Sequence, residues 1–260
     1  MSVKLPEGIS SIGERAFSQC SSLRKINVPS SAASIDESAF WDCKSLVGVY
    51  ISKNNKNYSS VDGIVFNKNK TSIICYGAGR KADKYTIPSG VSRIGRGAFY
   101  GCTGLKSVKA ENGVTDFGAS VFRGCSSLTK AELPDSVSVI SFAMFRECSS
   151  LRDIKLPAGI TLIDNFAFYG CTSLKKLDIP DGCTSIGNFV FYDCKSMKYA
   201  EIPGSVDKIG YGSYGFYYDR GKSCDVRDDD FILYGSQGGA AEKYADESNL
   251  HLLQARRLSS

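Results

Sequence analysis

The chain has 260 residues, of which 42% are hydrophobic and 23% charged, and its formal net charge is +5. It contains no apolar stretch of about 18 residues, the length that predicts a membrane-spanning helix, so direct membrane insertion is not expected. The small excess of positive charge does not predict a nucleic-acid partner, which requires a concentrated basic patch.

The amino terminus lacks the features of a secretion signal. Residues 1–6 contain no basic segment followed by an apolar one. The repeating pattern described below already begins at Leu5-Pro6. We therefore expect a fragment of a longer protein and draw little about location from the missing signal.

A 23-residue repeat runs through most of the chain. Each unit carries an apolar residue followed by Pro, and columns of Ile, Phe, Cys and Leu keep the same step. The step from Pro29 to Pro88 is one repeat plus 36 further residues, and the step from Pro88 to Pro134 is two repeats. The Phe and Cys columns are Phe17, Phe40, Phe99, Phe122, Phe145, Phe168 and Phe191, and Cys20, Cys43, Cys102, Cys125, Cys148, Cys171 and Cys194.

One unit, residues 151–173, shows the local structure that the repeat predicts. Ile154 and Leu156 alternate with polar residues, as in a short strand with one buried face. Pro157 ends this strand because it has no N–H to donate. Residues 160–163 form a second short extended segment, and residues 165–169 fit one helical or 3₁₀ turn. Stacking such units about 4.8 Å apart buries the apolar residues and pairs the first strands into a parallel sheet.

The unit resembles the BspA-like leucine-rich repeat, most clearly in residues 87–108, IPSGVSRIGRGAFYGCTGLKSV. This resemblance covers nearly the whole chain. It implies a right-handed α/β solenoid with a parallel sheet on one face and short second strands and helical turns on the other. It also implies a secreted or cell-surface protein of a host-associated or anaerobic microbe that acts in adhesion and not in catalysis, and that needs no cofactor. The family has no common binding motif, so the resemblance supplies no ligand residues.

We divide the single solenoid domain into repeats at 1–51, an inserted hairpin segment at 52–86, repeats at 87–224 and a C-terminal capping segment at 225–260. Residues 61–66 and 71–75 flank the polar residues 67–70, which predicts the hairpin. The repeat decays from Tyr211. A strand at 231–234 and a short helix at 240–249 are expected to cover the last coil.

The cysteine column has two interpretations, a metal or redox site and a column of buried small side chains. Each cysteine stands alone in its unit, whereas zinc sites use pairs such as Cys-x₂-Cys. We therefore predict buried core positions. Cys183 replaces a core Val in its unit, and Cys75 and Cys224 lie outside the pattern, so their state is not predicted.

The exposed strand positions are a candidate binding face. Along the stack, Lys130, Asp153 and Lys176 alternate in sign, and so do Glu132, Lys155 and Asp178. One interpretation is ion pairing between neighbouring strands, worth a few tenths of a kcal/mol per exposed pair. The other is a mixed-charge binding strip on the concave face. The candidate residues are Lys130, Glu132, Asp153, Lys155, Lys176, Asp178 and Tyr199.

A second candidate is the aromatic column that follows the Phe column, namely Trp41, Tyr100, Tyr169 and Tyr192. Exposed aromatic rings suit protein interfaces and sugar stacking. The alternative, which we favour, is packing between successive turns.

Metal binding and catalysis are not predicted. The run at residues 228–230 does not match the spacing of a calcium loop, and we expect a solvated turn. The one histidine, His251, lies in the closing tail without a partner for nucleophilic catalysis. A pair of carboxylates, as in glycoside hydrolases, can be found in any sequence, so counting carboxylates does not decide against a hydrolase, whereas the repeat architecture does.

The sequence thus favours a monomeric, extracellular or cell-surface module that binds a protein or glycan of a host or neighbouring cell. A passive spacer within a larger surface protein is the alternative.

Overall fold

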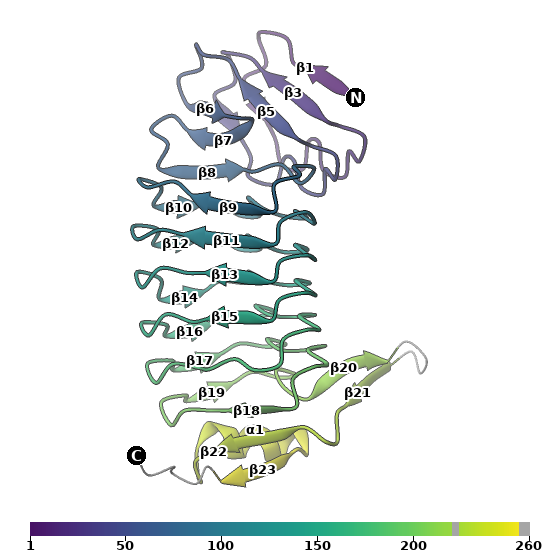
Figure 1. The fold of residues 1–260 in the computed structure, drawn as a ribbon, viewed down its shortest axis with the longest axis vertical. Helices are drawn as coiled ribbons and strands as arrows, with labels where there is room; N and C mark the ends of the chain where they lie inside the picture. Colours follow the sequence, from purple (N-terminus) through teal and green to yellow (C-terminus); the bar gives the residue numbers. More distant parts are fainter. Residues whose placement is uncertain (220–223, 255–260) are drawn as a thin grey trace.

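The computed structural model describes residues 1–219 and 224–254, with side chains for all of these except Asp153, Tyr218, Asp219 and residues 251–254. The chain winds into a long β-solenoid (Figure 1). Each regular coil contributes a first strand to one face and a two-residue second strand to another. Within each stack the strands pair in parallel at the 23-residue step, so that Lys109, Glu132 and Lys155 are register partners.

The first strands carry the alternating burial that the repeat predicts. They are β1 (Ser2–Lys4), β3 (Lys25–Val28), β5 (Gly48–Ile51), β9 (Lys84–Ile87), β11 (Ser107–Ala110), β13 (Lys130–Glu132), β15 (Asp153–Lys155) and β18 (Tyr199–Glu201). We call the surface that they form the first-strand face. It consists of the separate sheets β1-β3-β5, β9-β11-β13-β15 and β18-β22-β23, in which β22 (Ile232–Gly235) and β23 (His251–Gln254) come from the C-terminal segment.

The second strands lie behind the first strands in Figure 1 and are shorter. They are β2 (Ser11–Ile12), β4 (Ser34–Ile35), β10 (Arg93–Ile94), β12 (Asp116–Phe117), β14 (Val139–Ile140), β16 (Leu162–Ile163), β17 (Ser185–Ile186) and β19 (Lys208–Ile209). Each places one apolar residue, usually Ile, in the core, and β14, β16, β17 and β19 form one parallel sheet.

One coil departs from the predicted pattern. The repeat predicts a first strand at Lys176 to Asp178, but residues 175–180 form none, and the sheet that begins at β9 ends at β15. Leu174 and Leu177 are nevertheless buried, so the coil keeps its core contacts without joining the strand ladder.

The predicted helical turns are wrong. Phe166 has a φ of 59°, in the left-handed region, which no helix tolerates in its interior. The N–H groups of Phe166 and Phe168 donate to carbonyl groups of the next coil at 2.9 and 3.0 Å, while the N–H of Ala167 bonds three residues back within its own coil. A helix would keep all of these bonds inside the segment. Hydrogen bonds between coils therefore replace the helical bonds that the sequence predicts. The fold is a β-solenoid, and α1 (Ala240–Ser248) is the one α-helix of the described residues.

The insert forms two hairpins where one was predicted. Strands β6 (Tyr58–Val61), β7 (Ile64–Asn67) and β8 (Ser72–Cys75) pair antiparallel in order. β8 then pairs in parallel with β10, so the insert continues the second-strand sheet. Tyr76 takes the place of a Phe-column residue, with its ring centroid 4.7 Å from that of Phe99.

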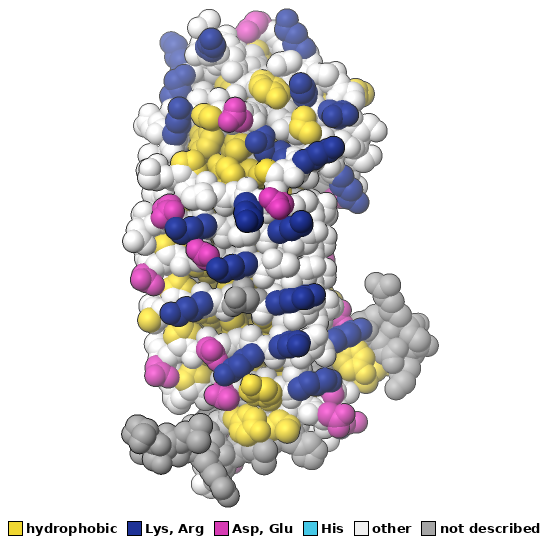
Figure 2. Space-filling model, in the orientation of Figure 1, with side chains coloured by type: hydrophobic (Ala, Val, Ile, Leu, Met, Phe, Trp, Pro, Cys, Tyr) yellow, Lys and Arg dark blue, Asp and Glu magenta, His cyan; other side chains and the backbone are white. Residues whose placement is uncertain are grey.

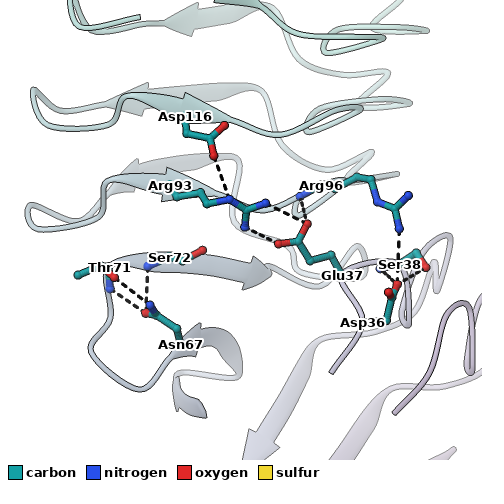
Figure 3. Close-up of polar contacts among 9 residues, drawn as sticks. All are labelled: Asp36, Glu37, Ser38, Asn67, Thr71, Ser72, Arg93, Arg96 and Asp116. Atoms are coloured by element: carbon teal, nitrogen blue, oxygen red, sulfur yellow. Dashed lines mark hydrogen bonds and ion pairs between the residues drawn. The ribbon is translucent and has the colours of Figure 1, made fainter. Parts of the chain in front are cut away.

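Polar side chains join the coils on the two sides of the insert (Figure 3). The Arg93 guanidinium forms an ion pair with Glu37, and its Nε donates to Asp116 Oδ2 at 2.9 Å. Glu37 Oε2 also accepts from the backbone N–H of Arg96 at 2.7 Å, and Arg96 lies 3.7 Å from Asp36 Oδ1. Glu37 precedes the insert and Arg93 follows it, so this cluster, which we call the junction clamp, bridges the interruption.

The C-terminal segment contains the expected strand and helix and two further elements. The strand is β22 (Ile232–Gly235), and α1 follows it. Tyr244 of α1 accepts from the backbone N–H of Tyr214 at 2.8 Å and donates to the carbonyl of the same residue at 3.0 Å. The helix thereby closes the core at the end of the stack. Sequence reasoning missed β23 (His251–Gln254) and the hairpin of β20 (Phe216–Asp219) and β21 (Cys224–Arg227), which projects from the column in Figure 1.

Candidate functional site

A groove of about 800 Å³ opens on the first-strand face, across β13, β15 and residues 178–180. Its apolar wall comes from the ends of successive coils, where Leu156-Pro157 and Ile179-Pro180 terminate the extended segments. The prolines have no N–H for the ladder, so each chain turns away at this point and leaves the groove between successive turns. We call this the sheet groove.

The charged rim of the sheet groove is arranged along each segment. Lys130 Nζ lies 2.7 Å from Glu132 Oε1, and Lys176 Nζ lies 2.8 Å from Asp178 Oδ1. The hydrogen bond from Lys130 lowers the pKa of Glu132, and the bond to Asp178 raises the pKa of Lys176. Lys155 is exposed and forms no ion pair within the described side chains, although it is the register partner of Glu132. The expected pairing between strands is therefore wrong for Glu132 and Lys155.

Four of the seven predicted face residues line the sheet groove: Lys130, Glu132, Lys155 and Asp178. Lys176 adjoins it through its ion pair. Tyr199 lies in β18, outside the groove lining, with its ring 6.1 Å from that of Tyr234. Asp153 lies in β15, but its side chain is outside the described part.

Sequence reasoning missed the apolar wall of the groove. The signal was present, because the apolar-Pro pair recurs in most units, but a residue that ends a strand gives no indication of the hollow beside it. A second groove, of about 790 Å³, occupies the equivalent place on β1, β3 and β5 and includes Pro6, Pro29 and Tyr50. Tyr50 is 38% exposed and Lys25 Nζ lies 5.9 Å from its ring centroid.

The predicted aromatic column forms two stacked pairs. The Trp41 and Tyr100 rings lie 5.2 Å apart with 8° between their planes, and Tyr169 and Tyr192 lie 5.0 Å apart at 10°. Arginines occupy the two coils between these pairs. Arg123 lies 5.5 Å from the Tyr100 ring and Arg146 lies 4.6 Å from the Tyr169 ring.

The neighbours in this column cover the faces of the rings. Stacked planes and guanidinium contacts stabilise the surface between coils and leave mainly ring edges outward. Tyr192 is itself buried, and its hydroxyl donates to Asp225. Burial is the larger cause of the raised pKa of Tyr192, and the contact with Asp225 is a smaller one. The geometry favours packing over face-on stacking against a ligand.

All ten cysteines are free thiols, and the column is buried apart from the half-buried Cys20. Thiols donate to the carbonyl of a Phe in the preceding coil, from Cys148 to Phe122 and from Cys171 to Phe145 at 3.1 and 3.2 Å. Burial raises the pKa of Cys43 to about 11 and that of Cys75 to about 12. The core interpretation is confirmed for this column and for Cys183, while Cys224 is exposed.

The Asp228 to Asp230 run forms a turn whose carboxylates contact basic side chains. Lys198 Nζ lies 2.8 Å from Asp228 Oδ2, and Arg227 lies 2.6 Å from Asp229 Oδ1. Across residues 1–219 and 224–254, no group of three or more His, Cys, Asp or Glu side chains is placed to hold a metal ion. The same residues contain no helix long and apolar enough to cross a membrane.

Solved structures of bacterial leucine-rich-repeat proteins share this fold. A leucine-rich-repeat protein of Eubacterium ventriosum is 24% identical, with a TM-score of 0.68 over 81% of this chain and 63% of its own. A leucine-rich cell surface protein of Faecalibacterium prausnitzii is 27% identical, with a TM-score of 0.68 over 82% and 60%. The pneumococcal vaccine antigen PcpA, 19% identical with a TM-score of 0.64 over 98% and 68%, shares the fold.

The chain thus spans less than two thirds of the length of the first two of these proteins. No curated protein matches it. The profile of the BspA type leucine rich repeat region matches residues 1–76, 74–171 and 150–220, which together cover the regular coils and the insert. The chain therefore belongs to the BspA-type leucine-rich-repeat family.

Proposed function

We propose that this chain is a non-catalytic recognition module of a bacterial cell-surface protein, binding a protein or glycan of a host or neighbouring cell through the sheet groove. The observation that carries the proposal is the groove itself, in which an apolar wall meets a charged rim. An apolar centre with a polar rim is the usual anatomy of a recognition surface. The F. prausnitzii relative, a cell surface protein, supports the location.

The state of the titratable groups supports a binding role over a catalytic one. A nucleophilic cysteine needs a lowered pKa, whereas burial raises the pKa of Cys43, Cys75 and Cys171. A carboxylic acid that donates a proton near neutral pH needs a raised pKa. The carboxyl groups with a resolved shift, Glu7 and Glu132 among them, have lowered pKa values.

The test is a binding screen against extracellular-matrix proteins and a glycan panel at physiological salt. Each hit is repeated with a groove variant in which Lys130, Lys155 and Lys176 are changed to Glu. A matched control changes the exposed Lys56, Lys208 and Lys243 to Glu, which alters net charge equally at positions outside the groove.

Saturable binding that is lost in the groove variant and kept in the control supports the proposal. Binding that survives in both moves the site to another surface, such as the second groove. A folded protein that binds nothing favours the passive spacer, for which the short coverage of longer relatives is the supporting observation.

A further inference from the structure

Beside the sheet groove runs a row of basic side chains that the sequence analysis did not single out. Lys106, Arg152, Lys175 and Lys198 each follow the buried Leu or Met that begins a coil on the first-strand face. We call these four residues the basic strip. Thr129 occupies the same position in the coil between Lys106 and Arg152. Figure 2 shows Lys and Arg side chains in a row down the right-hand side of this face.

All four side chains of the basic strip are exposed. Lys106 lies 3.8 Å from Asp83, and Lys198 lies 2.8 Å from Asp228, which raises the pKa of that lysine. Arg152 and Lys175 form no ion pair within 4 Å with the side chains that the structure describes. Like charges on adjacent coils repel each other, and a bound anionic chain would relieve the repulsion.

Two carboxylates of this face, Glu132 and Asp178, lie away from the central part of the basic strip. Glu132 and Asp178 stand further along their segments, at the sheet groove, where each pairs with a Lys of its own coil. Exposed basic side chains therefore line one margin of the first-strand face, parallel to the stack (Figure 2), and the central two have no described carboxylate within 4 Å. A modest net charge of the whole chain conceals this separation.

A band of hydroxyl groups lies three residues before Arg152 and Lys175, in a hollow that Glu147 and Asp193 also line. Thr172 donates through Oγ1 to the carbonyl of Ser149 at 3.2 Å, and Ser149 donates through Oγ to the carbonyl of Ser126 at 3.4 Å. These bonds occupy the hydroxyl hydrogens and leave the oxygens able to accept from a ligand. Sugar hydroxyl groups are donors of the kind that this band accepts.

We propose that the basic strip binds a linear sulfated polysaccharide that lies along the solenoid axis. The strip supplies up to one cation per coil, and successive coils lie 5.3–5.5 Å apart at the Phe column, a spacing comparable to one sugar ring. Exposed ion pairs are each worth at most about 1 kcal/mol, so affinity requires an anion at nearly every cation. Sulfation supplies this density, whereas a carboxylate on alternate sugars does not.

A nucleic acid fits this surface less well. Duplex DNA presents one charge per about 1.7 Å of its axis, far denser than the strip. Single strands bind where aromatic side chains stack on bases, and the strip and the hydroxyl band consist of Lys, Arg, Ser and Thr. The proposal rests on the recognition function proposed above, to which it adds a ligand class, but its residues lie outside the sheet groove.

The test titrates fluorescently labelled heparin with the whole chain and measures the dissociation constant by anisotropy. The strip variant carries Arg152→Glu and Lys175→Glu. The control carries Lys56→Glu and Lys208→Glu, with the same change in net charge. We expect the dissociation constant to rise at least about tenfold in the strip variant, since two exposed charges are reversed, and less than about twofold in the control.

Three further measurements sharpen the result. Desulfated heparin, which keeps its carboxylates, should bind at least about tenfold more weakly than heparin. Equal loss in the strip variant and the control, or desulfated heparin binding as tightly as heparin, would overturn the proposal. The proposal would also be overturned if a DNA duplex bound as tightly as heparin and lost the same affinity in the strip variant. If the Glu variant fails to fold, Arg152→Gln with Lys175→Gln tests the same contacts.

The single substitution Lys155→Glu separates this proposal from the one before it. It should leave heparin affinity within about twofold, because Lys155 lies at the far end of its strand from Arg152. If heparin binds and the screen finds no ligand of the sheet groove, the basic strip is supported and the groove proposal fails. If a groove ligand is found and heparin does not bind, the groove proposal is supported and the basic strip fails.

Discussion

The regular stack after the insert and the two coils before it have the same repeat but different cores. After the insert, ring centroids in the Phe column follow each other at 5.3–5.5 Å from Phe99 to Phe191. Before it, the column holds only Phe17 and Phe40, 5.8 Å apart. The buried side chains form two clusters, one from Ile12 to Cys75 and the other from Ile64 to Ala245.

The insert lies between these two clusters and contributes buried side chains to both. Ile64 and Phe66 of β7 belong to the later cluster, whereas Val65 between them belongs to the earlier one. β8 divides likewise, with Ile73 on one side and Ile74 on the other. A strand buried on both faces is apolar at successive positions. The insert is therefore a wall shared by two cores, and the junction clamp is the polar link at its margin.

Raising the pH should give the largest effect, and it should act more strongly on the later cluster. A thiol with a raised folded-state pKa stays protonated there while it ionises in the unfolded chain above about pH 8.5. Its stabilisation is complete below that value and falls by about 1.4 kcal/mol per pH unit above it. Thiols with a raised pKa are more numerous in the later cluster than in the earlier one. They are Cys102, Cys148, Cys171, Cys183 and Cys194 against Cys43 and Cys75.

Urea unfolding with a reducing agent, at about pH 8 and about pH 9.5, measures this effect. We expect the free energy of unfolding to fall by several kcal/mol over this interval, by the same linkage applied to several thiols. Cys148→Ala should reduce the slope by about 1.4 kcal/mol per pH unit. A stability that does not change with pH in this window would show that the buried thiols do not control it.

Deleting one ring from each Phe column should separate the two cores. Phe145 is fully buried between Phe122 and Phe168, so Phe145→Ala should cost about 3–5 kcal/mol of unfolding free energy. Phe17 is half-buried at the open end of its short column, so Phe17→Ala should cost clearly less. Equal losses, measured by urea unfolding, would contradict the difference between the cores.

Breaking the junction clamp should loosen the earlier coils without unfolding the later ones. Glu37→Gln removes the charge that Arg93 contacts, and both side chains are partly exposed, so we expect a loss of about 1 kcal/mol. Amide hydrogen exchange should accelerate in residues 1–51 and not in residues 87–210. The double variant Glu37→Gln with Arg93→Gln should lose less than the two single losses combined, because the two residues interact.

The repeating parts of this molecule could be predicted from the sequence. The parts whose structure depends on contacts between neighbouring coils could not. The columns of Phe, Cys and Ile predicted which side chains are buried, because periodic burial leaves its mark on every unit. The turn at Phe166 was mistaken for a helix, since local spacing cannot show that its N–H groups bond to the next coil. The hairpin of β7 and β8 was predicted correctly, but β6 was missed, and so was the burial of β7 and β8 on both faces, which their successive apolar residues signal. The grooves were not predicted, because each is formed by residues of several coils and no single unit of the sequence shows it.

The smallest effect on stability should come from the residue on which the recognition proposal most depends. Lys155 is exposed and forms no ion pair with the described side chains, so Lys155→Glu should change the free energy of unfolding by no more than about 0.5 kcal/mol. The same change should weaken any ligand of the sheet groove. Lys130→Glu is the matched comparison, because it also breaks the contact with Glu132, whereas both substitutions place two carboxylates on one strand. Lys130→Glu should therefore cost more stability than Lys155→Glu. If chemical denaturation ranked the two in the opposite order, Lys155 would be holding the sheet together, and its place in the groove would need no ligand to explain it.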